Sequence, residues 1–397
     1  MSNNALLNPS VITKETLVIL ENNLVAAGKV NRQFENQFVK IGSSVTIRKP
    51  NRFLVSSGPG LSIQDISEPS TSITISNQKH VDFQFSSQDL TLTVEEFSER
   101  YIKPAAAELA NQLDYDVLQN TTSLQNWVGP QGAGTAPNSF AALAAVGQRM
   151  DEGAVPQDGR VLVLNPAAYW ALANALIGVY VKSVAEPALK GYLANIANFE
   201  IYEDQNVANL TNGNYAGTGV VNGASQSGSN LVTNGWTASR TNLFLGGEVI
   251  TIAGVYAINP KSRKSTGALQ NFLVTGPVSS DASGNATLPI YPAISTTGAY
   301  QTVSVSPANL AGVTVISGTA NVTYPQNVGF VKDCFGLVTV PLELPEGVDF
   351  KARETYKGIS MRIIRAYDIN NDVFPARIDI LYGTTTFYPE LGVRLTG

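Results

Sequence analysis

The chain has 397 residues, of which 44% are hydrophobic and only 14% are charged, and its net charge is −5. Average soluble proteins contain about 25% charged residues. This length predicts two or three domains with substantial apolar cores. The single cysteine, Cys334, and the single histidine, His80, exclude a disulfide framework, zinc fingers and any metal site built from several His or Cys ligands. The acidic balance disfavours a general nucleic-acid binder.

The sequence predicts neither a targeting segment nor a membrane span. Residues 1–7 lack the basic start and continuous apolar run of a signal peptide. The most apolar stretch, residues 169–181, has 13 residues and contains Asn174, whereas a membrane helix needs about 20. We therefore expect a soluble protein with no membrane partner, made in a compartment that is reducing or in which redox conditions do not matter.

Charge is spread unevenly along the chain. Residues 1–52 carry seven Lys or Arg against three Glu, whereas residues 53–210 sum to −10. Residues 211–330 contain only six charged residues but 16 of the 34 glycines. Short apolar runs there, about ten residues apart and separated by turn residues, predict a small antiparallel barrel or sandwich. This all-β insert interrupts an α+β body, and the strands before and after it are expected to share one sheet.

The N-terminal part is predicted to contain one helix and one β-ribbon. The helix has apolar residues at helical spacing, namely Leu17, Leu20, Leu24 and Ala27. Thr13 is expected to cap it and Gly28 to end it. Residues 42–93 alternate apolar and polar residues on both sides of the turn-rich stretch 56–60, which predicts two strands joined by a long tip. Because an isolated two-stranded ribbon is marginal in water, it is expected to lie against its own chain or another.

Residues 94–120 give the strongest helix prediction. Thr93 and Glu96 have the spacing of a capping box, and the acidic residues of the first turns suit the helix dipole. Pro104 lies inside this stretch and is expected to kink the helix or to split it at Lys103.

Helices and strands alternate through residues 137–205. Helices are predicted at 140–150, opened by Asn138 or Ser139, and at 167–179, opened by the cap Asn165-Pro166. The strands expected in the body are residues 160–164, 199–202, 337–340, 359–364 and 377–381.

No catalytic or cofactor motif is present. Gly28-Lys29 lacks the upstream glycine of a phosphate-binding loop, and the glycine pair in 217–219 is expected in a solvated loop. Residues 368–372 have oxygen ligands at calcium-loop spacing but lack the required glycine, so we expect a turn between two strands. Cys334 is expected in the core, and His80 on the surface or in an interface. We therefore expect no enzyme, no cofactor and no metal site.

Four segments of the body resemble the major capsid proteins of tailed phages, most closely podovirus-type coat proteins with an inserted β-domain. TLTVEEFSERYIKPAAAELANQLD, at 91–114, is similar to their spine-helix signature, and VTIRKP with Arg52-Phe53 to the start of their E-loop. VLVLNP at 161–166 with Tyr169 resembles the strand-to-helix junction of their axial domain, and RIDILYG at 377–383 with Pro389-Glu390 their C-terminal strand pair.

The resemblance implies the Hong Kong 97-type capsid fold, an α+β fold, with an added all-β insertion domain. The corresponding division is an N-terminal arm at 1–41, an E-loop β-ribbon at 42–93, a peripheral domain with the spine helix at 94–136, the first part of the axial domain at 137–210, the insertion domain at 211–330, and a second axial part with return strands at 331–397. The insertion domain is expected either to stabilise its own subunit as a folding nucleus or to touch a neighbour.

The function implied by this resemblance is that of a structural major capsid protein. Copies would self-assemble as hexamers and pentamers into an icosahedral shell around phage double-stranded DNA. The expected partners are other copies of the chain, a scaffolding protein, a portal protein, a decoration protein in some relatives, and the packaged DNA through non-specific contacts. The expected location is the virion capsid, with assembly in the host cytoplasm.

Three other readings remain open at this point. An encapsulin-type nanocompartment shell has the same fold but encloses an enzyme and no genome. A β-rich phage tail or adhesion protein would share the composition of residues 211–330 but would not need the helices of the body. A hydrolase would need two carboxylates that converge in a pocket.

Charge patterning suggests one contact between subunits. Basic residues near the base of the ribbon are expected to meet acidic residues of a neighbour's spine helix and to set register rather than stability. These residues are Arg48, Lys49 and Arg52 on the ribbon and Glu95, Glu96 and Glu99 on the helix. The alternative is that all six are simply solvated.

Overall fold

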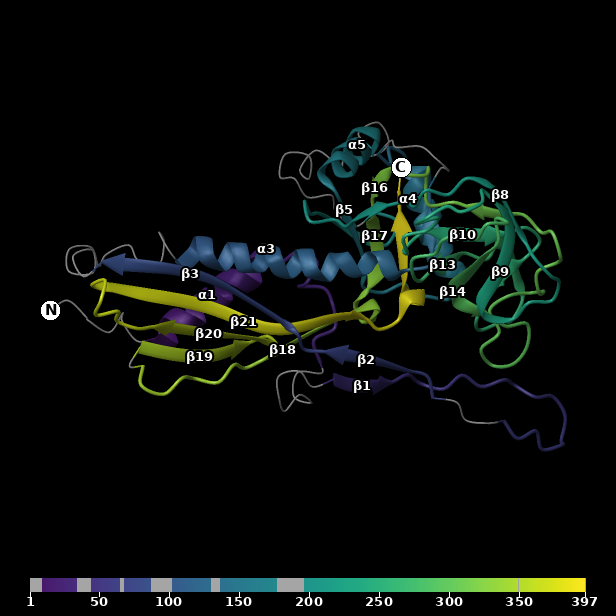
Figure 1. Cartoon of the computed structure of the whole chain (residues 1–397). Coiled ribbons are helices and arrows are strands. Elements are labelled where there is room, and N and C mark those ends of the chain that lie inside the picture. The colour runs from purple at the N-terminus through teal and green to yellow at the C-terminus, as the bar shows by residue number, and fades with distance from the viewer. Residues whose placement is uncertain are drawn as a thin grey trace. The chain divides into compact units, whose positions relative to one another are not determined.

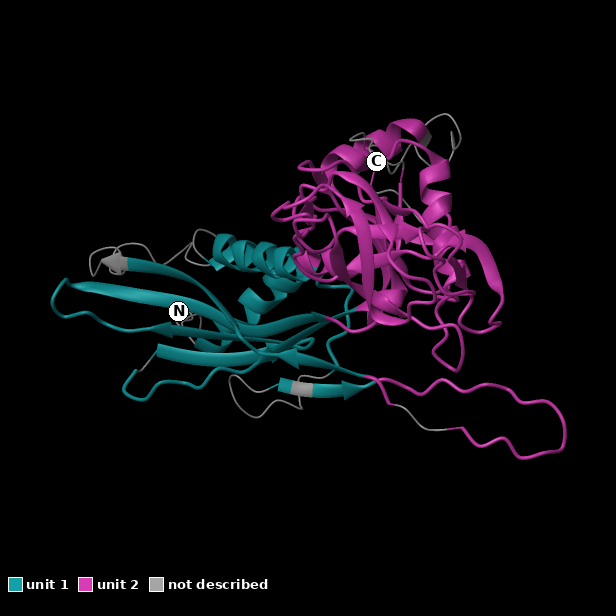
Figure 2. Cartoon of the chain, turned by 45° about the vertical axis from the view of Figure 1, so that its right-hand side comes forward, with its two compact units in different colours: residues 1–48, 70–117, 335–385 teal, residues 49–69, 118–334, 386–397 magenta. Residues whose placement is uncertain are grey.

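The structure is a computed structural model that describes residues 9–33, 44–64, 68–86, 102–129, 136–176, 196–348 and 350–396. The chain forms two compact units, which Figure 2 colours separately. Unit 1 consists of residues 1–48, 70–117 and 335–385, and unit 2 of residues 49–69, 118–334 and 386–397. Among the described residues, no helix combines the length and the apolar character needed to cross a membrane.

Unit 1 is built on a five-stranded sheet. Its strands are β3 (Asn77–Ser86), β18 (Phe335–Val340), β19 (Phe350–Tyr356), β20 (Ile359–Arg365) and β21 (Val373–Thr386). The long β21 pairs antiparallel with both β3 and β20, and β20 pairs with β19. Three of these strands confirm the predictions for the C-terminal part, whereas β19 has no predicted counterpart because its sequence is largely polar.

The helix α1 (Pro9–Asn23) packs on β19 and β20. Leu17 and Leu20 are buried, as their helical spacing predicts. The predicted cap, Thr13, instead lies inside the helix, where its hydroxyl donates a hydrogen bond of 2.7 Å to the carbonyl of Pro9. Threonine in a helix often bonds the carbonyl four residues earlier, so the predicted helix start was wrong. The predicted end at Gly28 was wrong as well, because the helix ends at Asn23.

The helix α3 (Lys103–Gln119) is the described part of the helix predicted at 94–120. Pro104 lies in this helix; because residues 87–101 are outside the described part of the chain, the kink or split expected at Lys103 stays a prediction. The capping box formed by Thr93 and Glu96 lies outside the described residues. On β21, the hydroxyl of Tyr382 donates to the carboxylate of Asp116 on this helix.

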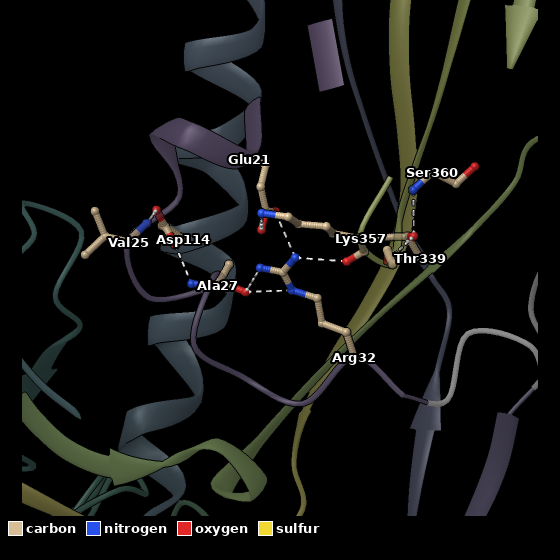
Figure 3. A network of polar contacts seen from close by, with 9 residues as sticks. Glu21, Val25, Ala27, Arg32, Asp114, Thr339, Lys357 and Ser360 are labelled. Atoms are coloured by element: carbon tan, nitrogen blue, oxygen red, sulfur yellow. Dashed lines mark hydrogen bonds and ion pairs between the residues drawn. The ribbon is translucent and has the colours of Figure 1, made fainter. Parts of the chain in front are cut away.

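A buried aspartate of α3 holds the segment that follows α1, as Figure 3 shows. The carboxylate of Asp114 accepts the backbone N–H groups of Val25 at 2.8 Å and of Ala27 at 2.6 Å. The guanidinium of Arg32 donates to the carbonyl of Ala27 and pairs with Glu21 at 2.8 Å. These contacts fix the described N-terminal segment within unit 1.

The predicted ribbon is confirmed by the antiparallel pairing of β1 (Ser44–Arg48) with β2 (Ser70–Thr74). Ile73 on β2 is buried. The end of β2 passes so close to β21 that a Cβ on Gly383 would lie 2.3 Å from the carbonyl oxygen of Thr74. Glycine permits this approach, and the base of the ribbon therefore lies against its own chain.

The body of unit 2 is a second five-stranded sheet. In order, its strands are β4 (Trp127–Val128), β22 (Gly392–Leu395), β17 (Asn327–Val331), β5 (Arg160–Leu164) and β6 (Phe199–Glu203). β5 pairs parallel with β6 and antiparallel with β17. Strands that precede the all-β segment thus share a sheet with strands that follow it, which confirms the expectation from the sequence.

Two helices with side-chain caps pack on this sheet. For α4 (Phe140–Glu152), Ser139 Oγ accepts the N–H of Ala142 at 3.2 Å. For α5 (Pro166–Leu176), Asn165 Oδ1 accepts the N–H of Ala168 at 3.0 Å. Both caps are those predicted. The helices and the sheet share one apolar core, which includes Leu143, Val146, Leu162, Leu172 and Phe199.

The remaining large sheet of unit 2 is a six-stranded antiparallel barrel, of which Figure 1 labels β8, β9, β10, β13 and β14. In order, its strands are β15 (Val313–Val315), β10 (Val249–Ile252), β13 (Phe272–Val274), β14 (Ala286–Ile294), β9 (Gly228–Trp236) and β8 (Gly217–Val221). The edges join because Val221 donates to the carbonyl of Ala311, and Leu310 donates to that of Val221, each at 2.9 Å. Of the two predicted architectures, a barrel and a sandwich, the structure therefore shows the barrel.

The glycine pair in 217–219 lies in β8 and not in the predicted solvated loop. A Cβ on Gly219 would lie 2.1 Å from Cζ2 of Trp236, whose ring is buried in the barrel. Glycine inside a strand marks a close approach here rather than a turn. The prediction was wrong because composition does not reveal which ring occupies the space beside a glycine.

The barrel is attached to the sheet of unit 2 by buried contacts. Trp127 of β4 joins an apolar cluster with Val249 and Leu273, which lie on barrel strands. The buried Arg394 of β22 donates to the carbonyl of Gly247, before β10, at 2.8 Å. One side of the barrel therefore packs against its own chain.

Candidate functional site: the exposed loop between β1 and β2

Residues 52–63, which we call the exposed loop, are accessible to solvent throughout. Three of its apolar side chains have almost no cover: Val55 is 99% exposed, Leu61 90% and Ile63 84%. Phe53 and Leu54 are exposed as well. Figures 1 and 2 draw this segment as a loop between β1 and β2. Monomeric proteins rarely gather apolar side chains at one exposed place, and such a surface indicates a contact with another molecule.

A glutamine side chain holds the two arms of the loop together. Gln64 Oε1 accepts the N–H of Leu54 at 2.7 Å, and Gln64 Nε2 donates to the carbonyl of Leu54 at 2.6 Å. The amide thus forms the pair of hydrogen bonds that a neighbouring strand would otherwise form. Lower down, the N–H of Lys49 donates to the carbonyl of Pro69 at 2.7 Å. Such preorganisation reduces the entropy lost when the loop binds a partner.

Charged side chains hold the base of the loop within unit 2. Arg52 pairs with Glu390 at 3.0 Å, and its guanidinium lies 5.8 Å from the centre of the Tyr300 ring. The ammonium of Lys49 lies 4.9 Å from the centre of the Tyr388 ring. Burial lowers the pKa of Lys49 and raises the pKa of Tyr388. Partly exposed pairs of this kind are worth about 0–1 kcal/mol each, so they orient the loop more than they stabilise the fold.

The structure describes only part of the predicted contact between subunits. Arg48 ends β1, and Lys49 and Arg52 follow at the base of the loop, where Arg52 already has the intrachain partner Glu390. The acidic residues Glu95, Glu96 and Glu99 lie outside the described residues. Pairing between the two groups stays a prediction. The sequence analysis missed the apolar residues of the loop, although their crowding between glycines and serines was a usable signal.

The other residues singled out in the sequence have structural roles. Cys334 is buried, as predicted, and burial raises the pKa of its thiol. His80 is on the surface, with Nδ1 at 2.7 Å from Asp82 Oδ2. Residues 368–372 form the predicted turn between β20 and β21, where Asp368 accepts the N–H of Asn370 at 2.9 Å. Within the described part of the chain, no three acidic, His or Cys residues are grouped as metal ligands.

Comparison with known proteins extends these observations. The whole chain, residues 1–397, matches the family model of the P22 coat protein, gene protein 5. A solved chain from Mycobacterium phage Che8 is similar with a TM-score of 0.50 and 14% identity, over 94% of this chain and 90% of that chain. The capsid of Ralstonia phage GP4 gives a TM-score of 0.45 and 8% identity, over 90% and 83% of the two chains. Curated proteins give no match.

The structural likeness supports the fold, and the family match supports the function. The two five-stranded sheets, the helix α3 and the exposed loop account for the expected elements that the structure describes. The chain therefore belongs to the P22 coat protein family and is a bacteriophage major capsid protein of the Hong Kong 97-type fold, a self-associating structural component of the virion capsid and not an enzyme.

Proposed function

We propose that this capsid protein assembles as hexamers and pentamers into a closed icosahedral shell that encloses phage double-stranded DNA. The observation that carries the proposal is the exposed loop, in which Val55, Leu61 and Ile63 are 99%, 90% and 84% exposed. Burial of a large apolar side chain is worth about 1.5–3 kcal/mol. A loop of this kind on every copy, received by the next copy, links identical subunits head to tail and closes rings.

The proposal includes the division of the chain given by the resemblance. The arm is 1–41, the E-loop ribbon 42–93, the peripheral domain 94–136, the two axial parts 137–210 and 331–397, and the insertion domain 211–330. Pairing of the ribbon cations with the spine glutamates of a neighbour would set the register of adjacent subunits. The ion pair of Arg52 with Glu390 would hold the base of the loop in one orientation for that contact.

Assembly is proposed to take place in the host cytoplasm with a scaffolding protein, and a portal protein replaces one pentamer. A decoration protein is a further proposed partner. Contact with the packaged DNA is proposed to be non-specific, because the net charge of −5 favours a lining that lets the genome move during packaging. Shells purified from infected cells should contain nuclease-protected DNA, whereas an encapsulin-type shell would contain an enzyme and no genome.

The test places charges on the exposed loop. One variant carries Val55→Asp, Leu61→Asp and Ile63→Asp. The matched control adds the same three charges to the same loop at exposed polar positions, as Ser56→Asp, Ser57→Asp and Ser62→Asp. Both proteins are expressed with the scaffolding protein and examined by sedimentation and electron microscopy. We expect closed shells with pentameric vertices from the control and at least a tenfold lower yield of shells from the apolar-site variant. Equal yields would remove the loop as the basis of the proposal.

A further inference from the structure

One turn of unit 2 is rich in cations and has no carboxylate of its own. Residues 259–264, which we call the basic turn, join the antiparallel strands β11 (Tyr256–Ile258) and β12 (Ser265–Leu269). The basic turn contains Lys261, Arg263 and Lys264, and the longer stretch 249–280 contains no Asp or Glu. The basic turn and the base of the exposed loop both belong to unit 2, drawn in magenta in Figure 2.

Asn259 holds the basic turn in one conformation. Its Oδ1 accepts the N–H groups of Lys261 at 2.9 Å and of Ser262 at 3.0 Å, and its carbonyl accepts the N–H of Arg263 at 2.8 Å. Its Nδ2 donates to the carbonyl of Glu152, the last residue of α4, at 3.0 Å. The backbone that carries Arg263 is therefore fixed before any ligand arrives, which reduces the entropy lost on binding.

The guanidinium of Arg263 has a buried donor that finds no acceptor. Its Nη1 atom is covered from solvent, and none of the described residues accepts a hydrogen bond from it. Burial, and after it the charge of Arg52, lowers the pKa of Arg263, so the two cations lie close enough to repel each other. An arginine side chain stays charged in proteins, and a buried donor without a partner is costly, more so when it is charged. The basic turn thus brings an unsatisfied cation to the base of the exposed loop.

One carboxylate, that of Glu390, does not balance the cations at this place. Its Oε1 pairs with Arg52 at 3.0 Å, and its charge also acts on Lys49. Lys49, Arg52 and Arg263 therefore share a single negative charge, which leaves an excess of two positive charges. Two buried acceptors lack donors as well in the part of the chain that the structure describes, namely Glu390 Oε2 and Asn51 Oδ1. A ligand that suits this place is an anion that both accepts and donates hydrogen bonds.

We infer that Arg52 and Arg263 form a binding site for free phosphate at the base of the exposed loop. The forked donors of a guanidinium match the oxygens of phosphate, and a phosphate oxygen would accept the buried Nη1 donor of Arg263. The hydrogen phosphate ion carries two negative charges, which balance the excess, and one O–H group, which suits the acceptors at Asn51 and Glu390. The bound ion would remove the repulsion between the two arginines and hold the loop base to the basic turn. The inference concerns the single subunit and does not depend on closure of the shell.

The alternative occupants fit less well. Water donates and accepts hydrogen bonds but leaves the charge unbalanced. Chloride and an ionised carboxylate each carry one negative charge and have no O–H group to donate. A phosphodiester of DNA also carries one charge and has no O–H group. The charge and the unpaired acceptors together therefore favour free phosphate over each of these ligands.

Calorimetric titration of sodium phosphate into the unassembled full-length chain, at constant ionic strength, tests the site. Arg263→Gln removes the charged fork, and Lys264→Gln is the matched control because it removes the same charge from the next residue, which is exposed. We expect Arg263→Gln to bind phosphate roughly tenfold more weakly or worse, and Lys264→Gln to bind it within about twofold of the wild type. Acetate, chloride and a short DNA duplex should not displace phosphate. Absence of phosphate binding, an equal loss in both variants, or displacement by acetate, chloride or DNA would overturn the inference.

A second variant covers the case in which Arg263→Gln disturbs the turn. Arg263→Lys keeps the charge and loses the fork, so it should still bind phosphate more weakly than the wild type. Amide hydrogen exchange locates the site, because phosphate should slow exchange at residues 261–263 in the wild type and in Lys264→Gln. Unchanged affinity in Arg263→Lys, or no protection of these amides by phosphate, would refute the inference. Both measurements use single subunits, so their failure would leave the proposed shell standing, and failure to form shells would leave the phosphate site standing.

Discussion

Replacing Gly219 with alanine should open the barrel locally. The added Cβ would lie 2.1 Å from Cζ2 and 2.4 Å from Cη2 of Trp236. The ring is held in place, because its Nε1 donates to Thr233 Oγ1 at 2.8 Å and its plane meets Phe244 edge-on at a centroid distance of 5.4 Å. The backbone of β8 is also fixed, by its pairing with β9. Neither partner can move without breaking other contacts.

The size of the effect follows from which partner gives way. Overpacking by one methyl group usually costs about 1–3 kcal/mol, and loss of a buried tryptophan from a core about 3–5 kcal/mol. At 2.1 Å the ring must leave its site, so we expect a loss of about 3–5 kcal/mol in local unfolding free energy. Gly276→Ala is the control, since the nearest atom to its added Cβ is Pro289 Cγ at 4.0 Å. It should be neutral or stabilising by about 0.4–1 kcal/mol.

Amide hydrogen exchange in the full chain measures this loss, because it resolves local opening in a protein with more than one unit. Barrel amides in Gly219→Ala should exchange roughly two to four orders of magnitude faster. In a Trp236→Leu background the same substitution should cost less than about 1 kcal/mol, because the clashing ring is gone. An equal cost in both backgrounds, or exchange no faster than in Gly276→Ala, would refute the packing argument.

Two further predictions concern other parts of the chain. Asp114→Ala removes the charged acceptor of two backbone hydrogen bonds, each worth about 1.5–3 kcal/mol. Amides at 25–27 should therefore exchange at least a hundredfold faster. The exposed control Asp158→Ala should leave their exchange unchanged. Burial raises the pKa of Tyr215 from 10.0 to about 12. Below pH 10 the phenol is protonated in both states, whereas between pH 10 and 12 only the unfolded chain loses the proton, so this contribution to stability falls as pH rises through that window. Tyr215→Phe should flatten the decline of the unfolding midpoint there, and an unchanged slope would count against the assignment.

One strand and two helix caps that depend only on neighbouring residues were predicted correctly from the sequence. The strand Arg160–Leu164 is buried on both faces, and its continuous apolar run marks it with the observed bounds. Ser139 and Asn165 each cap a helix through a hydrogen bond to a residue three positions later, a spacing that the sequence displays directly. The barrel strands Val249–Ile252 and Phe272–Val274 are short apolar runs of the same kind.

Contacts between distant residues are not displayed by the sequence. The glycines of β8 are typical of a loop by composition, and only the structure shows that Trp236 lies against Gly219. Arg52 was chosen as a contact residue for its charge, but its partner Glu390 lies 338 positions away and nothing in the sequence joins the two. The apolar residues of the exposed loop posed the opposite problem. Their crowding between glycines and serines marks them in the sequence, but the exposure of each side chain follows only from the folded chain.

Deletion of the barrel cannot separate a role in folding of the subunit from a role in assembly of the shell. Trp127, Val249 and Arg394 tie the barrel to the sheet of unit 2 through buried contacts, so its removal would strip cover from that sheet and destabilise the subunit. Loss of shells after deletion would therefore follow whether or not the barrel touches a neighbour.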